Sequence, residues 1–332
     1  MPESSKELTI KQILDIATKS HSEGRLNEAE NIYKKILEAH PDNSNALHLL
    51  GLIAYQKNKN KEAVELISRA IKLNPNSIYY SNLGMVYDSL KENEISAECF
   101  KKALELNPKY ENANKSHYNL GIFFMSKGEY SKALDHYNKS IELNRNFFDA
   151  FWNRSLVLLL LGKFKEGWEG YEYRFKKESS VDSKNFNKPK WNGSSLKGKK
   201  ILIASEQGFG DNIQFVRYIP LIKSNGGNII LECKKELKKL FEDSFEINKN
   251  VDEILEKNER LNKDFDFYIH IMSLPRIFKT EIDSIPNKIP YLKADPYLIE
   301  KFKKKIEQGI NKKNLNKIKT GIVWAGNPGY EN

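Results

Sequence analysis

A short stretch near the middle of the chain places acidic, amide and basic side chains around two glycines. Residues 201–220 read ILIASEQGFGDNIQFVRYIP, with an aliphatic run before the polar cluster and a helical pattern after it. The residues there that carry chemical groups or allow close approach are Glu206, Gln207, Gly208, Gly210, Asp211 and Arg217. A carboxylate at this place can act as a general base toward a hydroxyl group, or it can cap the first turn of a helix.

The two glycines are expected to let the backbone turn sharply and approach a ligand. Asp211 then lies at or beside the helix start, where the helix dipole favours its charge. If Asp211 only caps the helix, its role is structural. The neighbouring Glu206, Gln207 and Arg217 favour a binding site, because a purely structural turn does not need several polar groups at one strand end.

The turn belongs to a predicted α/β region. Short β-branched runs alternate with helical patterns, which is typical of a parallel sheet with crossover helices. The runs predict strands at 200–205, 228–233, 265–271 and 320–324, with a further short strand at 251–255. The predicted helices lie near 211–224, 234–241 and 295–308. Ligands bind such sheets at the carboxyl ends of the strands, and Asp211 follows one of them.

The same glycines permit a second interpretation, a dinucleotide-binding turn. GFGDNI supplies two glycines of that motif, and Glu232 ends the second strand 24 residues after Gly208. Ile213 stands where a third glycine is required, and Asp211 would set a negative charge beside a pyrophosphate. A nucleotide-dependent oxidoreductase is therefore an alternative whose motif is incomplete.

The first half of the chain carries an internal repeat. A small residue, a second small residue and a proline recur at offsets of 12 and 24, with Gly51, Ala63 and Pro75 as the template. A large apolar or aromatic residue follows each second small position by four residues, at Tyr33, Ile67, Phe100 and Tyr137. Each unit is thus predicted to be a pair of antiparallel helices, whose small residues let the two backbones approach closely.

This pattern resembles the tetratricopeptide repeat. The units lie at about 10–43, 44–76, 77–113, 114–147 and 148–181, and the last is degenerate. Three extra residues before Gly121 predict a longer loop at the third junction. We therefore expect an α solenoid over residues 1–181 whose concave groove holds a polypeptide partner.

Asparagine stands two residues before the first small position in three consecutive units, at Asn82, Asn119 and Asn153. A side-chain amide offers one acceptor and two donors, so a row of them can pair with the backbone of an extended peptide of any sequence. The row resembles the asparagine ladder in the repeat domain of O-linked N-acetylglucosamine transferases. The alternative is a set of solvated groove residues, since the first two units have Asp15 and Leu49 instead.

A polar segment at 182–198 is expected to be a linker, and a domain at 199–332 follows it. Several segments resemble the glycosyltransferase region that follows tetratricopeptide repeats in many bacterial proteins: EGWEGYEYRF, PKWNGSSLKGKKILIASEQGFGDNIQFVRYIPLI, FDFYIHIMSLP, IPYL and GIVWAGNP. The resemblance spans about 165–328, to the heptosyltransferase-like family of two-domain glycosyltransferases. It implies a Rossmann-like, acceptor-side domain in which Asp211 matches the proposed general base. The side chains and backbone expected to shape the acceptor side are those of Gln207, Gly208, Gly210 and Arg217.

The resemblance also implies a second Rossmann-like domain that binds the nucleotide-sugar and begins at GIVWAGNP. The sequence stops at Asn332, so we expect the donor half to be missing and catalysis to require a supplied second domain. No cofactor and no metal are expected for such a transfer. The alternative function is a non-catalytic scaffold for protein–protein interaction, in which only the repeats bind a partner.

Composition and residue spacing limit the classes of protein and of binding site that remain. Of 332 residues, 39% are apolar and 30% charged, and most of the net charge of +10 lies after Val181. The lysine run from Lys301 to Lys319 lacks interleaved aromatics and a strong apolar stripe, so binding to nucleic acid or to a membrane surface is not expected. Cys99 and Cys233 are far apart and the six histidines form no ligand pair, which indicates neither a disulfide nor a metal site.

Targeting signals are equally sparse. The opening MPESSKELTIKQ lacks the apolar core of a signal peptide, and the longest apolar run, 156–161, is too short to span a bilayer. A cytoplasmic location is therefore expected.

Overall fold

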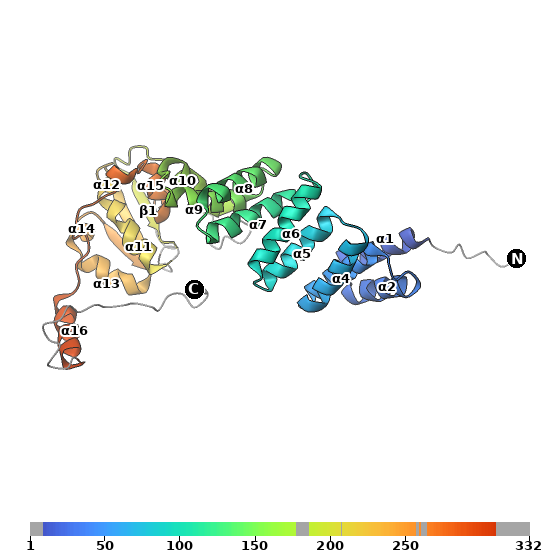
Figure 1. Ribbon diagram of the computed structural model, residues 1–332. Helices are drawn as coiled ribbons and strands as arrows, with labels where there is room; N and C mark the ends of the chain where they lie inside the picture. The colour runs from blue at the N-terminus through green and yellow to red at the C-terminus, as the bar shows by residue number, and fades with distance from the viewer. Residues whose placement is uncertain (1–8, 177–185, 207, 257–258, 260–263, 310–332) are drawn as a thin grey trace. The chain divides into compact units, whose positions relative to one another are not determined.

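The computed structural model describes residues 9–176, 186–206, 208–256, 259 and 264–309 (Figure 1). The chain divides into two compact units, Met1–Leu161 and Gly162–Asn332. The first is helical and the second is built around a parallel sheet. No helix in the described ranges combines the length and the apolar character that a membrane crossing requires.

The described part of the first unit consists of helices that pair along the chain, drawn from blue to green in Figure 1. They are α1 (Ile10–Ser22), α2 (Leu26–Ala39), α3 (Ser44–Gln56), α4 (Asn60–Leu73), α5 (Ser77–Ser89), α6 (Asn93–Leu106), α7 (Ala113–Ser126), α8 (Tyr130–Leu143) and α9 (Phe148–Leu160). The first four predicted helix pairs are confirmed. The junction at 107–112 is longer than those at 40–43, 74–76 and 144–147, as the three extra residues predict.

The small residues act as the repeat pattern predicts. A Cβ atom on Gly121 would lie 2.5 Å from a ring carbon of Tyr137, and one on Gly51 would lie 2.6 Å from Ile67. Tyr137 and Ile67 are fully buried and have no room to move away. Glycine is therefore required where the two helices of a pair cross, because only it lets the large side chain of the second helix reach the first.

The second unit begins with α10 (Phe164–Tyr171), which continues as the 3₁₀ helix η1 (Glu172–Lys176). The ring of Trp168 lies edge-on to Phe215, with centroids 5.8 Å apart, and the Tyr171 hydroxyl lies 3.8 Å from the sulfur of Met272. Both contacts are with the α/β unit. The division between the units thus falls between the two helices of the expected fifth pair.

Within the described residues the sheet consists of four parallel strands, in the order β3-β2-β1-β4. They are β1 (Lys200–Ala204), β2 (Asn228–Cys233), β3 (Glu253–Glu256) and β4 (Phe267–His270). Every residue of β1 and β2 after the first is buried, so both faces of the central strands are covered. Four predicted strands are confirmed, and the one expected at 320–324 lies outside the described residues.

The predicted helix at 211–224 is interrupted. It consists of α11 (Phe209–Phe215), the 3₁₀ turn η2 (Val216–Tyr218) and α12 (Ile219–Lys223). Pro220 explains the break, because it lacks the N–H that a continuous helix would donate to the carbonyl of Val216. The remaining helical elements are α13 (Lys235–Asp243), α14 (Phe245–Asn248), η4 (Ile271–Ser273), α15 (Leu274–Ile277), η5 (Ile282–Ser284) and α16 (Pro296–Gly309).

The described end of the expected linker packs on the sheet. The backbone N–H of Trp191 donates to the carbonyl of Tyr268 at 2.8 Å, and Lys190 forms a parallel bridge to the same residue of β4. Trp191 is 1% exposed and Leu196 is fully buried. Trp191 and Leu196 therefore anchor this part of the chain in the second unit's core, although Pro189 and residues 192–195 are exposed.

Candidate functional site

The turn that follows β1 places Asp211 in the first turn of α11. The backbone N–H of Gly208, the residue that precedes the helix, donates to the Asp211 carboxylate at 3.0 Å. Asp211 thus reaches back over the helix start, and the helix dipole favours its charge there. The carboxylate is half-buried, so it stays in contact with solvent while it caps.

The two glycines are not needed for the turn itself. Gly208 has φ −83° and ψ 177°, an extended conformation open to any residue, so the expectation that glycine permits a sharp turn is wrong here. Gly210 is exposed, and a Cβ atom there would meet nothing within 4 Å. Open space beside this backbone remains compatible with the close approach of a ligand. Gln207 lies outside the described residues.

The turn is held by a residue that sequence reasoning missed. Asn212 is 1% exposed, and its side-chain N–H groups donate to the carbonyls of Glu206 at 2.8 Å and Gly208 at 2.7 Å. These two bonds fix the path of the backbone from the strand into α11. Its Oδ1 atom is buried and accepts no hydrogen bond from the described residues.

Glu206 does not project into an open site. Arg174 of η1 binds both of its carboxylate oxygens, from Nε and from Nη2, each at 2.9 Å. Glu206 is 4% exposed and Arg174 is 7% exposed, so the pair is buried. The backbone N–H of Met272 donates to the same carboxylate at 3.2 Å, which joins the ends of β1 and β4 through one side chain.

The ion pair belongs to a larger buried network. Arg174 also donates to Glu172 at 3.0 Å and to the Ser273 hydroxyl oxygen at 2.9 Å, and Lys190 donates to Glu172. Burial acts to raise the pKa of Glu172, but the two cations outweigh it and hold that pKa at about 2. The pKa of Arg174 is raised by Glu206 and Glu172 against the opposing effect of its own burial. Both shifts favour the charged forms, so Glu172 and Arg174 are charged at neutral pH.

The network occupies a defined place in the sheet. The strand order reverses between β1 and β4, and in open α/β sheets ligands bind in the crevice at the carboxyl ends of the strands at that switch point. Glu206 follows β1, and Met272 and Ser273 follow β4. The guanidinium of Arg174 fills the space between them. Arg174 belongs to the EGWEGYEYRF segment. A side chain of this segment therefore occupies the crevice at the switch point, a role that the sequence pattern did not indicate.

Glu232, the acidic residue that a dinucleotide site would use to bind a ribose, also forms hydrogen bonds within the protein. It is 1% exposed and accepts from the backbone N–H of Ser205 at 3.3 Å and from its hydroxyl at 3.2 Å. A carboxylate buried against the neighbouring strand is not placed to reach a ribose. This geometry disfavours the dinucleotide alternative.

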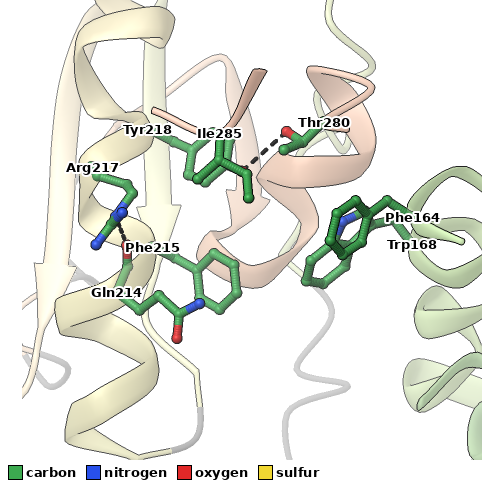
Figure 2. Close-up of a pocket in the computed structure, with 8 residues that line it drawn as sticks. All are labelled: Phe164, Trp168, Gln214, Phe215, Arg217, Tyr218, Thr280 and Ile285. Atoms are coloured by element: carbon green, nitrogen blue, oxygen red, sulfur yellow. Dashed lines mark hydrogen bonds between the residues drawn. The ribbon is translucent and has the colours of Figure 1, made fainter. Parts of the chain in front are cut away.

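Arg217 is separated from Asp211. Figure 2 shows its guanidinium beside the Gln214 carbonyl, at one side of a cavity of about 170 Å³ that Asp211 does not line. Arg217 also donates to the carbonyl of Pro286 at 3.2 Å and to the Tyr291 hydroxyl at 2.9 Å, and it stacks over the Tyr291 ring. The predicted acceptor residues therefore do not form one cluster: Gly208 and Asp211 are joined, and Arg217 anchors a later segment.

In the repeats, the asparagine row lies on the first helix of each pair. Asn82 of α5 donates to the His48 ring at 2.8 Å, and Asn153 of α9 donates to the Tyr118 hydroxyl at 3.0 Å. Asn119 of α7 instead lines a cavity of about 160 Å³. The three amides are half-buried. Side-chain hydrogen bonds join the first helices of successive pairs, α1 to α3, α3 to α5, α5 to α7 and α7 to α9, so the row lies on the side of the stack where these helices are in contact.

Three histidines of this unit are held neutral. Burial, with a small effect of His21, lowers the pKa of His48 to about 4, and its ring stacks on Tyr79 with centroids 4.3 Å apart. His117 and His136 share a hydrogen bond between their Nδ1 atoms at 3.0 Å. Burial is the main cause that lowers the pKa of each to about 4; a charge on the His136 ring would further disfavour a charged His117, and Lys139 acts on both. Across the described residues no group of three or more potential metal ligands comes together.

Known proteins match this chain over different shares of its length. The chain is 26% identical to protein FlbA of Caulobacter vibrioides over 305 residues, which covers 86% of this chain and 50% of FlbA. It is 27% identical over 242 residues to the human protein O-mannosyl-transferase TMTC3, covering 68% of this chain and 25% of that protein. It thus spans half or less of either relative. A crystal structure of MamA aligns with 53% of this chain and 99% of its own at 24% identity and a TM-score of 0.44.

Family models agree with the repeat pattern. Models of the tetratricopeptide repeat match residues 20–84, 77–110 and 115–147. These ranges contain most of the helix pairs from α2 to α8, with the glycines and buried rings that fit the two helices of each pair together. The helical unit of this chain is therefore built from tetratricopeptide repeats.

Proposed function

We propose that the repeats bind an extended polypeptide along their first helices. The observation that carries this proposal is the row Asn82, Asn119 and Asn153, one amide at the same position of three successive first helices. The amides are half-buried, so their remaining donors and acceptors are in reach of a bound backbone. A backbone ladder of this kind gives affinity without requiring a particular peptide sequence.

The test is removal of an amide that supports no contact within the protein. Asn119 accepts and donates no side-chain hydrogen bond among the described residues, so Asn119→Ala leaves the stack intact. Peptides selected by the full chain from a phage-displayed library of random 12-residue sequences serve as the probe. Two lost hydrogen bonds should weaken their binding about tenfold, measured by calorimetry. Asn138→Ala, on the second helix α8, is the control and should bind as the original chain does; equal binding by both variants would exclude the ladder.

A second candidate function is glycosyl transfer by the α/β unit. Residues 199–332 would then be the Rossmann-like, acceptor-side half of a heptosyltransferase-like enzyme, with a nucleotide-sugar held by a further domain. Three observations support it: the parallel order β3-β2-β1-β4 matches the first four strands of a doubly wound sheet, Asp211 follows the carboxyl end of β1, and the match to FlbA extends over both units. The name of TMTC3, a protein O-mannosyl-transferase, adds a link to sugar transfer, although this chain covers a quarter of that protein.

In this proposal the Gly208 N–H orients one oxygen of Asp211, and the carboxylate takes the proton of an acceptor hydroxyl as the hydroxyl oxygen bonds to the anomeric carbon of the sugar. The bond from the anomeric carbon to the phosphate oxygen breaks in the same step, and the nucleotide leaves with the electron pair. Asp211→Asn keeps an oxygen for the Gly208 N–H, so it separates the chemical role from the cap. Nucleotide release from nucleotide-sugars, in the presence of a selected peptide and any domain that completes the enzyme, should fall at least about 100-fold at unchanged melting temperature. Asp211→Ala should in addition lose about 1 kcal/mol of stability. Release that survives in the Asn variant would leave Asp211 as a cap.

A further inference from the structure

The cavity beside Asn119 has an apolar floor. It lies where α5 and α6 of one repeat meet α7 of the next, and its volume is about 160 Å³. Its lining residues are Asp88, Asn93, Ser96, Ala97, Phe100, Asn119, Ile122, Phe123 and Ser126. Ala97 and Phe100 are each 2% exposed and form the closed end. The Ser96 hydroxyl donates to the Gly84 carbonyl at 2.9 Å, so it needs no partner from within the cavity.

The size and polarity of this space suit one side chain. An apolar protein cavity of about 150 Å³ can hold benzene, so this cavity accepts a group of that size. Ile122, one helical turn from Asn119, is 42% exposed and extends the apolar surface to the mouth. An aliphatic or single-ring side chain that enters here would bury apolar area on both sides. A charged side chain that reached Ala97 and Phe100 would lose its hydration there, whereas a cationic one that stays at the mouth can meet Asp88.

An acidic group stands at the rim. Asp88, in the last turn of α5, is exposed and has no ion-pair partner among the described residues. Two carboxylates of α6 differ in this respect, since Glu94 pairs with Lys127 and Glu98 pairs with Lys101. Asp88 therefore offers an uncompensated negative charge beside an apolar opening.

Asn119 completes the arrangement. Its counterparts Asn82 and Asn153 each donate a side-chain hydrogen bond to the preceding repeat, whereas Asn119 forms no such bond among the described residues. An extended peptide that pairs its backbone with Asn119 would direct alternate side chains toward the same face. One of them then lies over the cavity and a neighbour lies near Asp88.

We propose that this cavity is a specificity pocket, which selects an aliphatic or single-ring side chain with a lysine or arginine close to it in the bound peptide. The inference rests on the proposed peptide-binding function of the repeats and adds the class of sequence that they accept. The amide row supplies affinity for any backbone, and the pocket with Asp88 supplies the choice of side chain.

The test compares the peptides that two charge variants select. The full chain is panned against the same library of random 12-residue peptides and should enrich Leu, Ile, Met or Phe within two residues of Lys or Arg. Asp88→Lys should lose the basic residue and enrich Asp or Glu instead, while it keeps the apolar one. A consensus peptide should bind the original chain about tenfold more tightly than its Lys→Glu version, and Asp88→Lys should reverse that order.

Glu142→Lys, an exposed substitution on α8, makes the same charge change elsewhere and should leave the selection unaltered. Peptides that bind in an Asn119-dependent way but keep their composition in Asp88→Lys would overturn the pocket and leave the proposed function standing. A library that yields no binder to the original chain would overturn both. Because Asp88 is exposed and unpaired, its substitution is not expected to disturb the fold, and an unchanged melting temperature verifies this.

Discussion

Replacing Arg174 with alanine is expected to lower the free energy of unfolding of the α/β unit by about 3–5 kcal/mol. The substitution leaves Glu206, which is 4% exposed, without the two hydrogen bonds that neutralise it. A buried carboxylate that loses its cation keeps the cost of desolvation without the compensating attraction. Hydrogen exchange of the β1 and β4 amides, read by mass spectrometry on the full chain, measures the loss within this unit.

Two further variants separate the buried pair from ordinary surface charge. Lys199→Ala removes an exposed ion pair to Asp266 at 3.2 Å and should cost less than about 1 kcal/mol. Replacing Arg174 and Glu206 together with methionine should cost less than Arg174→Ala alone, because no buried charge is left unpaired. If Arg174→Ala exchanges no faster than Lys199→Ala, the network does not hold the ends of β1 and β4 together.

Acidification from pH 7 to pH 5 is expected to destabilise the repeat unit by about 4 kcal/mol. The pKa values of His48, His117 and His136 are lowered to about 4 in the folded chain, against an ordinary value of 6.5. Between pH 6.5 and pH 4 the unfolded chain therefore binds more protons than the folded one, and stability falls as the pH falls. His48 alone contributes about 2 kcal/mol at pH 5, and the coupled pair a similar amount.

The pH range in which stability is lost distinguishes the effect of these histidines from that of carboxylates. Glu30 also has a pKa lowered to about 2, mainly by hydrogen bonds from Lys34 and Lys57, so its contribution is lost only below about pH 4.5. Thermal unfolding followed by circular dichroism at pH 7, 6 and 5 measures the effect. His48→Gln should remove roughly half of the pH dependence, whereas the exposed His40→Gln should leave it unchanged. A melting temperature that is the same at pH 7 and pH 5 would contradict the assignment.

The helical unit could be predicted from the sequence because its determinants are local. The distance from Gly121 to Tyr137 along the chain is fixed by two helices and a tight turn, so spacing alone indicates which small residue meets which ring. The strands were predictable for a similar reason, since continuous aliphatic runs such as β1 and β2 are typical of strands buried on both faces.

The site was less predictable because its contacts are distant in sequence. Glu206 meets Arg174 across 32 residues and an intervening segment, and neither residue belongs to a motif that names its partner. The one available signal was physical: a carboxylate at the end of a buried strand requires a cation, and the aromatic segment around Arg174 could have supplied it. Arg217 shows the converse, because nearness to Asp211 in sequence did not bring the two side chains to one place.

The position of α10 and η1 has a practical meaning for dissecting the chain. A fragment cut at residue 182 or 199, where composition changes, would leave behind the tryptophan that covers Phe215 and the guanidinium that neutralises Glu206. Its freshly uncovered aromatic face and orphaned acid would favour aggregation. A fragment that starts at Gly162 keeps both the tryptophan and the guanidinium, and is therefore the one to isolate.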